Sequence, residues 1–392
     1  MHDLSYNIRE QSEFTTARAG TLRLGNKAIE TPRRCLHVGT DRLSESLRIN
    51  NSEARGLNEL YRVIDQDTLR ELANNVGSQE VFNAHIQNAL SRISPGEISL
   101  VFLAYDGRTE SQPNVVSLPD ANETEYLADL SYSFGDAVIP PVLVGQSAGN
   151  YLAFLKQYFQ IVKGLDHKPI FGLVPYCSWR ELRPLLEFYR NEGLHLFTMD
   201  LRGRPPTLLS QNVVMTLRTL RQIQSESGQD CYLNALNVGT GRALPQMPVA
   251  PAKDILSLVA GFDSFGPSHV ALKVRPDLLP FRGTKPAVRL FVRRDYGYYR
   301  SDAPELNNPA DLQENLLSTS LDDVRHAESF PLARKLQKVY NAERQALEAG
   351  SMRSTITSHE SIKNFLGSKK QVTDELRKVT RMASELSIPT LD

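Results

Sequence analysis

Apolar runs rich in β-branched and aromatic residues alternate along the chain with longer segments in which apolar side chains recur every three or four residues. The runs, each of which predicts a buried strand, are Ile98–Tyr105, Ala137–Val144, Pro169–Val174, Leu194–Met199 and Tyr232–Leu236. The periodic segments predict helices over Asn150–Lys163, Trp179–Asn191, Pro206–Ser225 and Pro251–Ala260. Such alternation is typical of parallel strands covered by helices. It favours an α/β protein built as a (β/α)8 TIM barrel, with a doubly wound open sheet as the alternative.

Segments outside this region predict smaller units at both ends of the chain. Residues 14–30 alternate between polar and apolar side chains, which predicts a hairpin that covers the bottom of the barrel. The polar, mostly helical stretch 40–98 is long for a first βα connection, and we expect it to form a lid or a partner surface. The expected parts are an N-terminal hairpin in residues 1–36, the barrel in residues 37–300, and a helical extension in residues 301–392 that packs on the barrel.

Composition narrows the classes of function. The 392 residues include 45 basic and 45 acidic ones, so no overall field attracts nucleic acid or an anionic membrane, and contact with nucleic acid needs a local patch. No stretch of about 18 apolar residues is present and residues 1–10 are too polar for a secretory signal, which predicts a cytoplasmic protein with no membrane partner. Three widely spaced cysteines are expected to be buried small hydrophobic side chains: Cys35, Cys177 and Cys231.

Acidic side chains follow several of the predicted strands. In a barrel of this type, functional groups collect at the carboxyl ends of the strands. Asp106 and Asp200 each end an apolar run, Asp263 lies in the segment GFDSFG, and the loop after Asp106 contains Asp120 and Glu123. Each acid is therefore a candidate for a site, with a helix cap or a turn as the alternative role.

Two basic clusters are candidates for contacts with phosphates or bases. Arg202 and Arg204 flank Gly203 and would bind a phosphate or the face of a purine, with a solvated loop as the alternative. A second cluster interleaves arginines with tyrosines, a mixture that stacks on bases while it pairs with phosphates, although an edge strand with a charged rim would read the same way. The members of this predicted nucleic-acid contact are Arg293, Arg294, Tyr296, Tyr298 and Arg300.

His37 lies in an otherwise apolar strand, just before the sequence Val-Gly-Thr. A hydrogen-bonded core histidine is the favoured interpretation, and a catalytic histidine is the alternative. The histidines of the chain are scattered and form no H-x-x-x-H or H-E-x-x-H pattern, so their spacing gives no support for a metal site.

Four segments, in a fixed order, carry a resemblance to a known family. Residues 14–40 combine an Ala-Arg-x-Gly hairpin, a Thr-Pro step and a strand that ends in Val-Gly-Thr. FGLVPYCSWRELR follows at 171–183, then a segment at 235–268 that ends with GFDSFGPS, and then a helical segment at 332–356. This order is similar to that of the tRNA-guanine transglycosylase family. The resemblance covers most of the chain and implies a TIM barrel that exchanges guanine for a 7-deazaguanine base in tRNA or DNA.

The sequence departs from the family at positions that contact the substrate there. GFDSFG places Gly266 where the family has its nucleophilic aspartate, while Asp263 matches the earlier aspartate of that motif. Asp106 and Gly107 are nearest in position to the motif that carries the other acid, and Pro175 replaces a base-recognising glutamine. The zinc clip of the family, three cysteines and a histidine, has no counterpart here, so no cofactor is expected.

Base exchange at a ribose needs a carboxylate that attacks C1′ and a second acid that handles protons on the departing and incoming bases. We expect Asp106 and Asp200 to be this catalytic pair, with Asp263 as a third candidate. The expected substrate-binding residues are Asp120, Glu123, Arg202, Gly203, Arg204 and Gly239. Two alternatives stay open. One is a non-catalytic subunit that binds nucleic acid or a catalytic partner in a homo- or heterodimer, and the other is a TIM-barrel enzyme that acts on a small ligand.

Overall fold

Parallel strands make up the centre of the molecule. The structure is a computed structural model that describes residues 4–387 except 110, 112–113, 166, 242–246, 271–287 and 308–317. One parallel sheet contains, in order, β5 (Leu36–His37), β6 (Leu57–Asp65), β7 (Ile98–Asp106) and β8 (Val142–Leu143). The second contains β9 (Phe171–Val174), β10 (Leu196–Arg204), β11 (Tyr232–Val238), β13 (Ser264–Phe265) and β4 (Arg33–Arg34). The predicted α/β class is confirmed.

The two parallel sheets contact each other at two places. Cys35 alone separates β4 from β5, and its backbone N–H donates to the carbonyl oxygen of Phe265 at 2.8 Å. At the other end, a parallel bridge pairs Val138, ahead of β8, with Ile170, ahead of β9. The strands thus follow one another from sheet to sheet in chain order.

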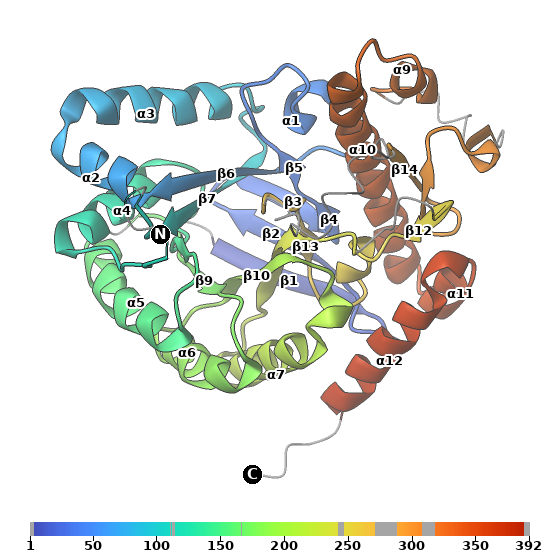
Figure 1. The fold of residues 1–392 in the computed structure, drawn as a ribbon. Helices are drawn as coiled ribbons and strands as arrows, with labels where there is room; N and C mark the ends of the chain where they lie inside the picture. The colour runs from blue at the N-terminus through green and yellow to red at the C-terminus, as the bar shows by residue number, and fades with distance from the viewer. Residues whose placement is uncertain are drawn as a thin grey trace.

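Helices surround these strands, and Figure 1 shows α2 to α7 as an arc on one side of them. The long helices begin where the sequence supplies a cap: Asp120 accepts from the backbone N–H of Glu123 at 2.9 Å, and Glu123 returns a contact to Asp120. The helices of this part are α1 (Glu45–Arg48), α2 (Gln66–Asn74), α3 (Val76–Leu90), α4 (Ala121–Ser133), α5 (Ala148–Lys163), α6 (Trp179–Asn191) and α7 (Ser210–Ser227).

The predicted hairpin is present as an antiparallel sheet of β1 (Leu4–Gln11), β2 (Arg18–Leu24) and β3 (Lys27–Thr31). The turn between β2 and β3 contains Gly25 with a φ of +61°, a backbone conformation that glycine adopts without steric cost. Buried side chains of this sheet, Leu22 and Ile29 among them, belong to the same apolar core as the parallel strands.

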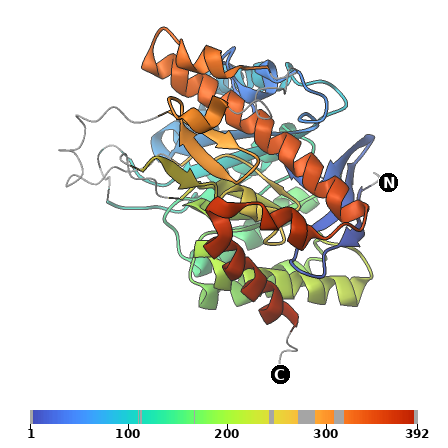
Figure 2. The ribbon, with the colours of Figure 1, turned by 90° about the vertical axis from the view of Figure 1, so that its right-hand side faces the viewer.

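The C-terminal part adds a second antiparallel sheet and further helices. Figure 2 shows the long helix α10 lying across one side of the molecule, where it packs against β14, β4 and β2. The core formed around the parallel strands also includes side chains of α10, α11 and α12, so the extension shares it. The elements are β12 (Val249–Pro251), β14 (Arg289–Val292), β15 (Gly297–Arg300), α9 (Leu321–Arg325), α10 (Phe330–Thr357), α11 (Ile362–Gly367) and α12 (Thr373–Ser387).

Three predicted elements need correction. Residues 57–65, which we expected to lie in a mostly helical region, form the nine-residue strand β6, although α2 and α3 follow it as helices. The helix expected over 251–260 is replaced by the end of β12 and a short 3-10 turn at Ile255–Ser257. Only two residues of the run 137–144 form a regular strand. The cysteine prediction is confirmed for Cys35 and Cys231, whereas Cys177 is half-buried.

Candidate functional site

Five polar side chains gather near the carboxyl ends of β11 and β13, and two of them come from the first half and the middle of β6 rather than from its carboxyl end. β6 contributes Glu59 and Tyr61, which lie two residues apart and therefore on one face of the strand. Asp200 lies in β10, Asn237 in β11, and His269 follows β13. Hydrogen bonds and ring contacts join the five, and we call them the edge network.

Asp200 is one acid of the edge network. Only 4% of this residue is exposed, and its Oδ1 accepts hydrogen bonds from the backbone N–H of Arg202 and from Nδ2 of Asn237, both at 2.9 Å. Burial raises the pKa of Asp200 above its usual value, and the two hydrogen bonds oppose the rise. The carboxyl group therefore holds a proton more readily than an exposed aspartate does.

Glu59 is the second acid of the edge network and is fully buried. Its Oε1 lies 2.7 Å from Nε2 of His269, whose backbone N–H donates to Oδ1 of Asn237 at 3.0 Å. Burial raises the pKa of Glu59, and the contact with His269 opposes the rise. The chain of contacts thus runs from Asp200 through Asn237 and His269 to Glu59.

A pair of stacked aromatic rings lies beside these acids. The ring of Tyr61 stacks on the imidazole of His269, with a centroid distance of 4.9 Å and an interplanar angle of 5°. Burial, followed by the charge of Asp200, raises the pKa of Tyr61 to about 12, so the phenol stays neutral at physiological pH. The two rings are in direct contact, so the flat face of Tyr61 is matched by the imidazole of His269.

Gly266 adjoins the edge network at the end of β13. A Cβ atom at this position would lie 2.0 Å from Oε2 and 2.1 Å from Oε1 of Glu59. Contacts below 3.0 Å are not tolerated by real side chains, so the carboxylate of Glu59 occupies the space that a side chain at position 266 would need. Only glycine fits at position 266, because the carboxylate of Glu59 from β6 fills the space beside it.

His37 also borders the network, with its ring centroid 5.0 Å from that of His269. We expected a hydrogen-bonded core histidine, but Nδ1 of His37 is buried and has no hydrogen-bond partner among the residues that the structure describes. Burial lowers the pKa of His37 to about 4. The imidazole is therefore neutral at physiological pH.

This pKa gives a prediction for acid stability. Because the folded-state pKa of about 4 lies below the value of about 6.5 in an unfolded chain, stability is fully present above pH 6.5 and is lost as the pH falls toward 4. The urea midpoint of the wild type should fall more between pH 7 and pH 4.5 than that of His37→Gln. If NMR finds a pKa near 6.5 for the His37 imidazole in the folded protein, burial does not lower this pKa and the prediction is wrong.

Arg202 and Arg204 lie over one aromatic ring beside the edge network. Their guanidinium carbons are 5.6 and 4.1 Å from the ring centroid of Tyr176, which follows β9. The backbone at Gly203 is left-handed, with a φ of +73°, and a Cβ at Gly239 would lie 1.9 Å from the carbonyl oxygen of Gly203. The left-handed backbone therefore explains Gly203, and the close approach of the two segments explains Gly239. The pair of cations remains a candidate contact for a phosphate or a base.

The acids after β7 form a separate group. Asp106 lies at the same edge of the strands, but its Oδ1 forms an ion pair with Nε of Arg108 at 2.8 Å. Asp120 and Glu123 form the capping box of α4, and Glu123 also contacts Arg70 at 3.3 Å. No hydrogen bond or ion pair within the described part of the chain joins this group to the edge network. Asp120 and Glu123 therefore have a structural role in beginning α4.

Asp263 lies away from the other candidate acids. Its two oxygens accept from Nε and Nη2 of Arg18 at 2.7 and 2.5 Å, from Tyr6 Oη at 2.5 Å and from the backbone N–H of Leu233 at 2.7 Å. Asp263 precedes β13, so it lies roughly 10 Å nearer the amino ends of the strands than Asp200 does. The buried ion pair is structural, which corrects the prediction of a catalytic Asp263.

The second basic cluster is not a stacking surface. Tyr296 is fully buried and Tyr298 is 5% exposed, so neither ring can stack on a base, and the prediction that they do is wrong. Arg293 forms an ion pair with Glu348 at 2.9 Å, and Arg300 forms one with Asp302 at 3.1 Å. The remaining member, Arg294, lies in the turn between β14 and β15.

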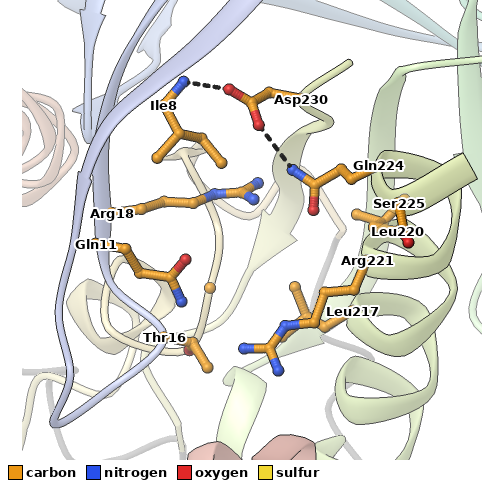
Figure 3. Close-up of a pocket in the computed structure, with 11 residues that line it drawn as sticks. Ile8, Gln11, Thr16, Arg18, Leu217, Leu220, Arg221, Gln224, Ser225 and Asp230 are labelled. Carbon is orange, nitrogen blue, oxygen red and sulfur yellow. Dashed lines mark hydrogen bonds between the residues drawn. The ribbon is translucent and has the colours of Figure 1, made fainter. Parts of the chain in front are cut away.

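A cavity of about 490 Å³ lies at the opposite end of the strands from the edge network (Figure 3). Asp230 and Gly261, which line it, precede β11 and β13. Oδ2 of Asp230 accepts from the backbone N–H of Ile8 at 2.7 Å, and its Oδ1 accepts from Gln224 at 3.3 Å. Nη1 of Arg221 donates to the carbonyl oxygen of Leu386 at 2.9 Å. These polar groups connect the hairpin, α7 and α12, so the cavity is not our candidate site.

Other classes of site leave no sign in the described ranges. Within them, no three or more His, Cys, Asp or Glu side chains are grouped to hold a metal ion, and none of the helices has the length and apolar character that a bilayer span requires. No protein-family model matches the chain, and no curated protein matches it either.

The sequence names Asp200 as a candidate, but it does not indicate the side chains that contact Asp200. Glu59 and Tyr61 were missed because the strand that carries them was not recognised. Asn237 lies one residue before the end of an apolar strand, so the strand-end rule could have found it. His269 had no local signal, because its role depends on a carboxylate 210 positions earlier in the chain.

Proposed function

We propose that the eight parallel segments form a closed (β/α)8 barrel. The strand order supports this, because β5 to β8 pair in chain order, as do β9, β10, β11 and β13. β13 also pairs with β4, which leads through Cys35 into β5, so β4 and β5 count as one segment. The contacts of Cys35 and Val138 bridge the two sheets at both ends. In such a barrel the active site lies at the carboxyl ends of the strands, and Asn237 and His269 of the edge network lie at the ends of β11 and β13.

We propose further that the protein is a divergent transglycosylase, which exchanges guanine for a 7-deazaguanine base in tRNA or DNA. The observation that carries this proposal is the pair of buried carboxyl groups, Asp200 and Glu59, linked through Asn237 and His269 beside the stacked ring of Tyr61. Base exchange needs two acids with separate roles and a flat space for a base. The resemblance described above supplies the substrate class.

Within this proposal Asp200 handles protons. The raised pKa lets it hold a proton for the leaving base and then accept one from the incoming base. Arg202 and Arg204, held beside Asp200 by the ring of Tyr176, bind a phosphate of the polynucleotide. Asp106, which forms an ion pair with Arg108, is the alternative candidate for this acid. Its variant Asp106→Ala is compared with the Asp200 variant in the exchange assay.

Asp200→Asn is expected to lower the rate of base exchange about 10²–10⁴-fold, because asparagine keeps the shape of the side chain but transfers no proton. The assay follows incorporation of labelled guanine or 7-deazaguanine into tRNA and into duplex DNA. Asp374→Asn, on the surface of α12, is the control and should leave the rate unchanged. A wild-type rate in Asp200→Asn together with a loss in Asp106→Ala would move the acid role to Asp106.

A second candidate function is that of a non-catalytic subunit. Two observations favour it: position 266 holds glycine, and Asp263 is engaged by Arg18. Such a subunit would bind tRNA or DNA, with an affinity that falls as salt rises, and would position a catalytic partner. Salt-dependent binding without exchange by the purified chain would support this function over the enzyme.

A further inference from the structure

We propose that Glu59 is the carboxylate that attacks C1′ of the nucleoside, and that Gly266 is the residue that makes room for it. This inference rests on the proposed base exchange and adds a residue that no sequence pattern indicates. It also explains how the chain manages without an acidic side chain at position 266.

The first support is the shared space of Glu59 and Gly266. A Cβ at position 266 would lie 2.0 Å from Oε2 and 2.1 Å from Oε1 of Glu59, which is too close for both groups to be present. A carboxylate therefore lies at the end of β13, although it arrives from β6. The carboxyl group of Glu59 thus lies where the side chain of an acidic residue at position 266 would begin, but it belongs to a different strand.

The second support is an oxygen of Glu59 without a partner. Oε1 contacts His269 at 2.7 Å, whereas Oε2 is buried and has no hydrogen-bond partner in the described part of the structure. An unsatisfied buried carboxylate oxygen destabilises a fold and so calls for an explanation, and a role in acting on a ligand is one that fits its place beside Asp200 and His269. Oε2 is the atom that we assign to the attack.

The third support is the arrangement of rings over Glu59. Nε2 of His269 contacts the carboxylate, and the imidazole stacks flat on Tyr61. A purine that takes the place of the imidazole against Tyr61 would move His269 aside and uncover Glu59. Binding of the base and exposure of the nucleophile are then one event, which keeps water from the carboxylate until the substrate is present.

The proposed exchange proceeds in two displacements at C1′. Oε2 of Glu59 forms a bond to C1′ while the bond from C1′ to N9 of guanine breaks, and the electron pair of that bond stays on N9, which takes a proton from Asp200. In the second half, N9 of the incoming base attacks C1′, the bond from C1′ to Oε2 breaks, and the N9 proton returns to Asp200. No oxidant, reductant or further reactant is consumed.

The test is to map the sugar adduct on the wild-type protein. The chain is incubated with tRNA or duplex DNA without an incoming base, denatured, and digested with nuclease and trypsin, and the modified peptide is found by mass spectrometry. Trypsin places the three acids in separate peptides, because arginines flank them: residues 56–62 contain Glu59, residues 93–108 contain Asp106 and residues 191–202 contain Asp200. We expect the adduct on residues 56–62.

The variant pair is Glu59→Gln and Glu97→Gln. Glu97 is a matched control, because it is also a largely buried glutamate that accepts from Asn58 and Arg55, but it lies before β7, at the amino ends of the strands. Glu59→Gln should lose the adduct and lower exchange on the order of 10³-fold or more, while Glu97→Gln keeps both.

Each outcome separates this inference from the proposed function. An adduct on residues 93–108 or 191–202, or exchange without any adduct, would leave the transglycosylase standing and overturn the role of Glu59. Neither exchange nor adduct in the wild type with either polynucleotide would overturn both proposals. If Glu59→Gln fails to fold, the adduct map of the wild type still decides.

Discussion

Arg18→Met is expected to lower the free energy of unfolding by about 3–5 kcal/mol, because it leaves the charge of Asp263 buried without its partner. Asp263 is completely buried, and both of its oxygens accept from the guanidinium of Arg18, at 2.7 and 2.5 Å. Nη2 of Arg18 also donates to the carbonyl oxygen of Cys231 at 2.7 Å. One side chain therefore connects β2 to the segments that begin β11 and β13. Urea unfolding at pH 7 measures the loss.

Two further variants make this result specific. Arg9→Met removes the exposed ion pair with Glu30, whose side chains are 53% and 39% exposed, and should cost less than about 1 kcal/mol. The double variant Arg18→Met with Asp263→Leu removes both buried charges and should be more stable than Arg18→Met alone. A loss for Arg18→Met no larger than that for Arg9→Met would show that Asp263 is not held by this pair.

The helices were the part of the fold most open to prediction. α5 and α6 follow the expected ranges within two residues at each end, because an apolar stripe and capping residues act within a few positions of the chain. The strands β7, β9 and β11 were also expected, since strands buried on both faces appear as continuous apolar runs.

Strand β6 shows why the rest could not be predicted. It contains the buried polar side chains Asn58 and Glu59, which break the apolar run that marks a strand. Asn58 donates to Glu97 at 2.7 Å, and Glu59 contacts His269, so the groups that permit this burial lie 39 and 210 positions away. Such partners have no local signature, and the site was missed together with the strand.

The tyrosines near residue 300 were misjudged for a related reason. A tyrosine between arginines indicates a surface that binds bases only when the ring is exposed. Tyr298 instead donates to Asp254 at 2.6 Å, a residue 44 positions earlier in the chain. Whether a phenol meets a ligand or a buried acid depends on tertiary contacts, which residue spacing does not contain.

Gly266→Ala is expected to lower the free energy of unfolding by about 1–3 kcal/mol and to lower base exchange at least about 10²-fold. The added methyl group would lie 2.0 Å from Oε2 of Glu59, and this carboxylate is held on its other oxygen by His269 at 2.7 Å. Either the backbone after β13 or the side chain of Glu59 must move. Both movements displace the carboxylate from the position that we assign to the attacking group.

The matched control for Gly266→Ala is Gly96→Ala, because a Cβ at Gly96 meets no atom within 4 Å. Gly96→Ala should change the free energy of unfolding by less than about 0.5 kcal/mol. In the background of Glu59→Ala, the same change at Gly266 should cost much less than in the wild type, since the methyl group then enters space that the carboxylate has left. Equal costs in the two backgrounds would show that Glu59 and Gly266 do not compete for one place, and the assignment of Glu59 as the relocated carboxylate would lose its geometric basis.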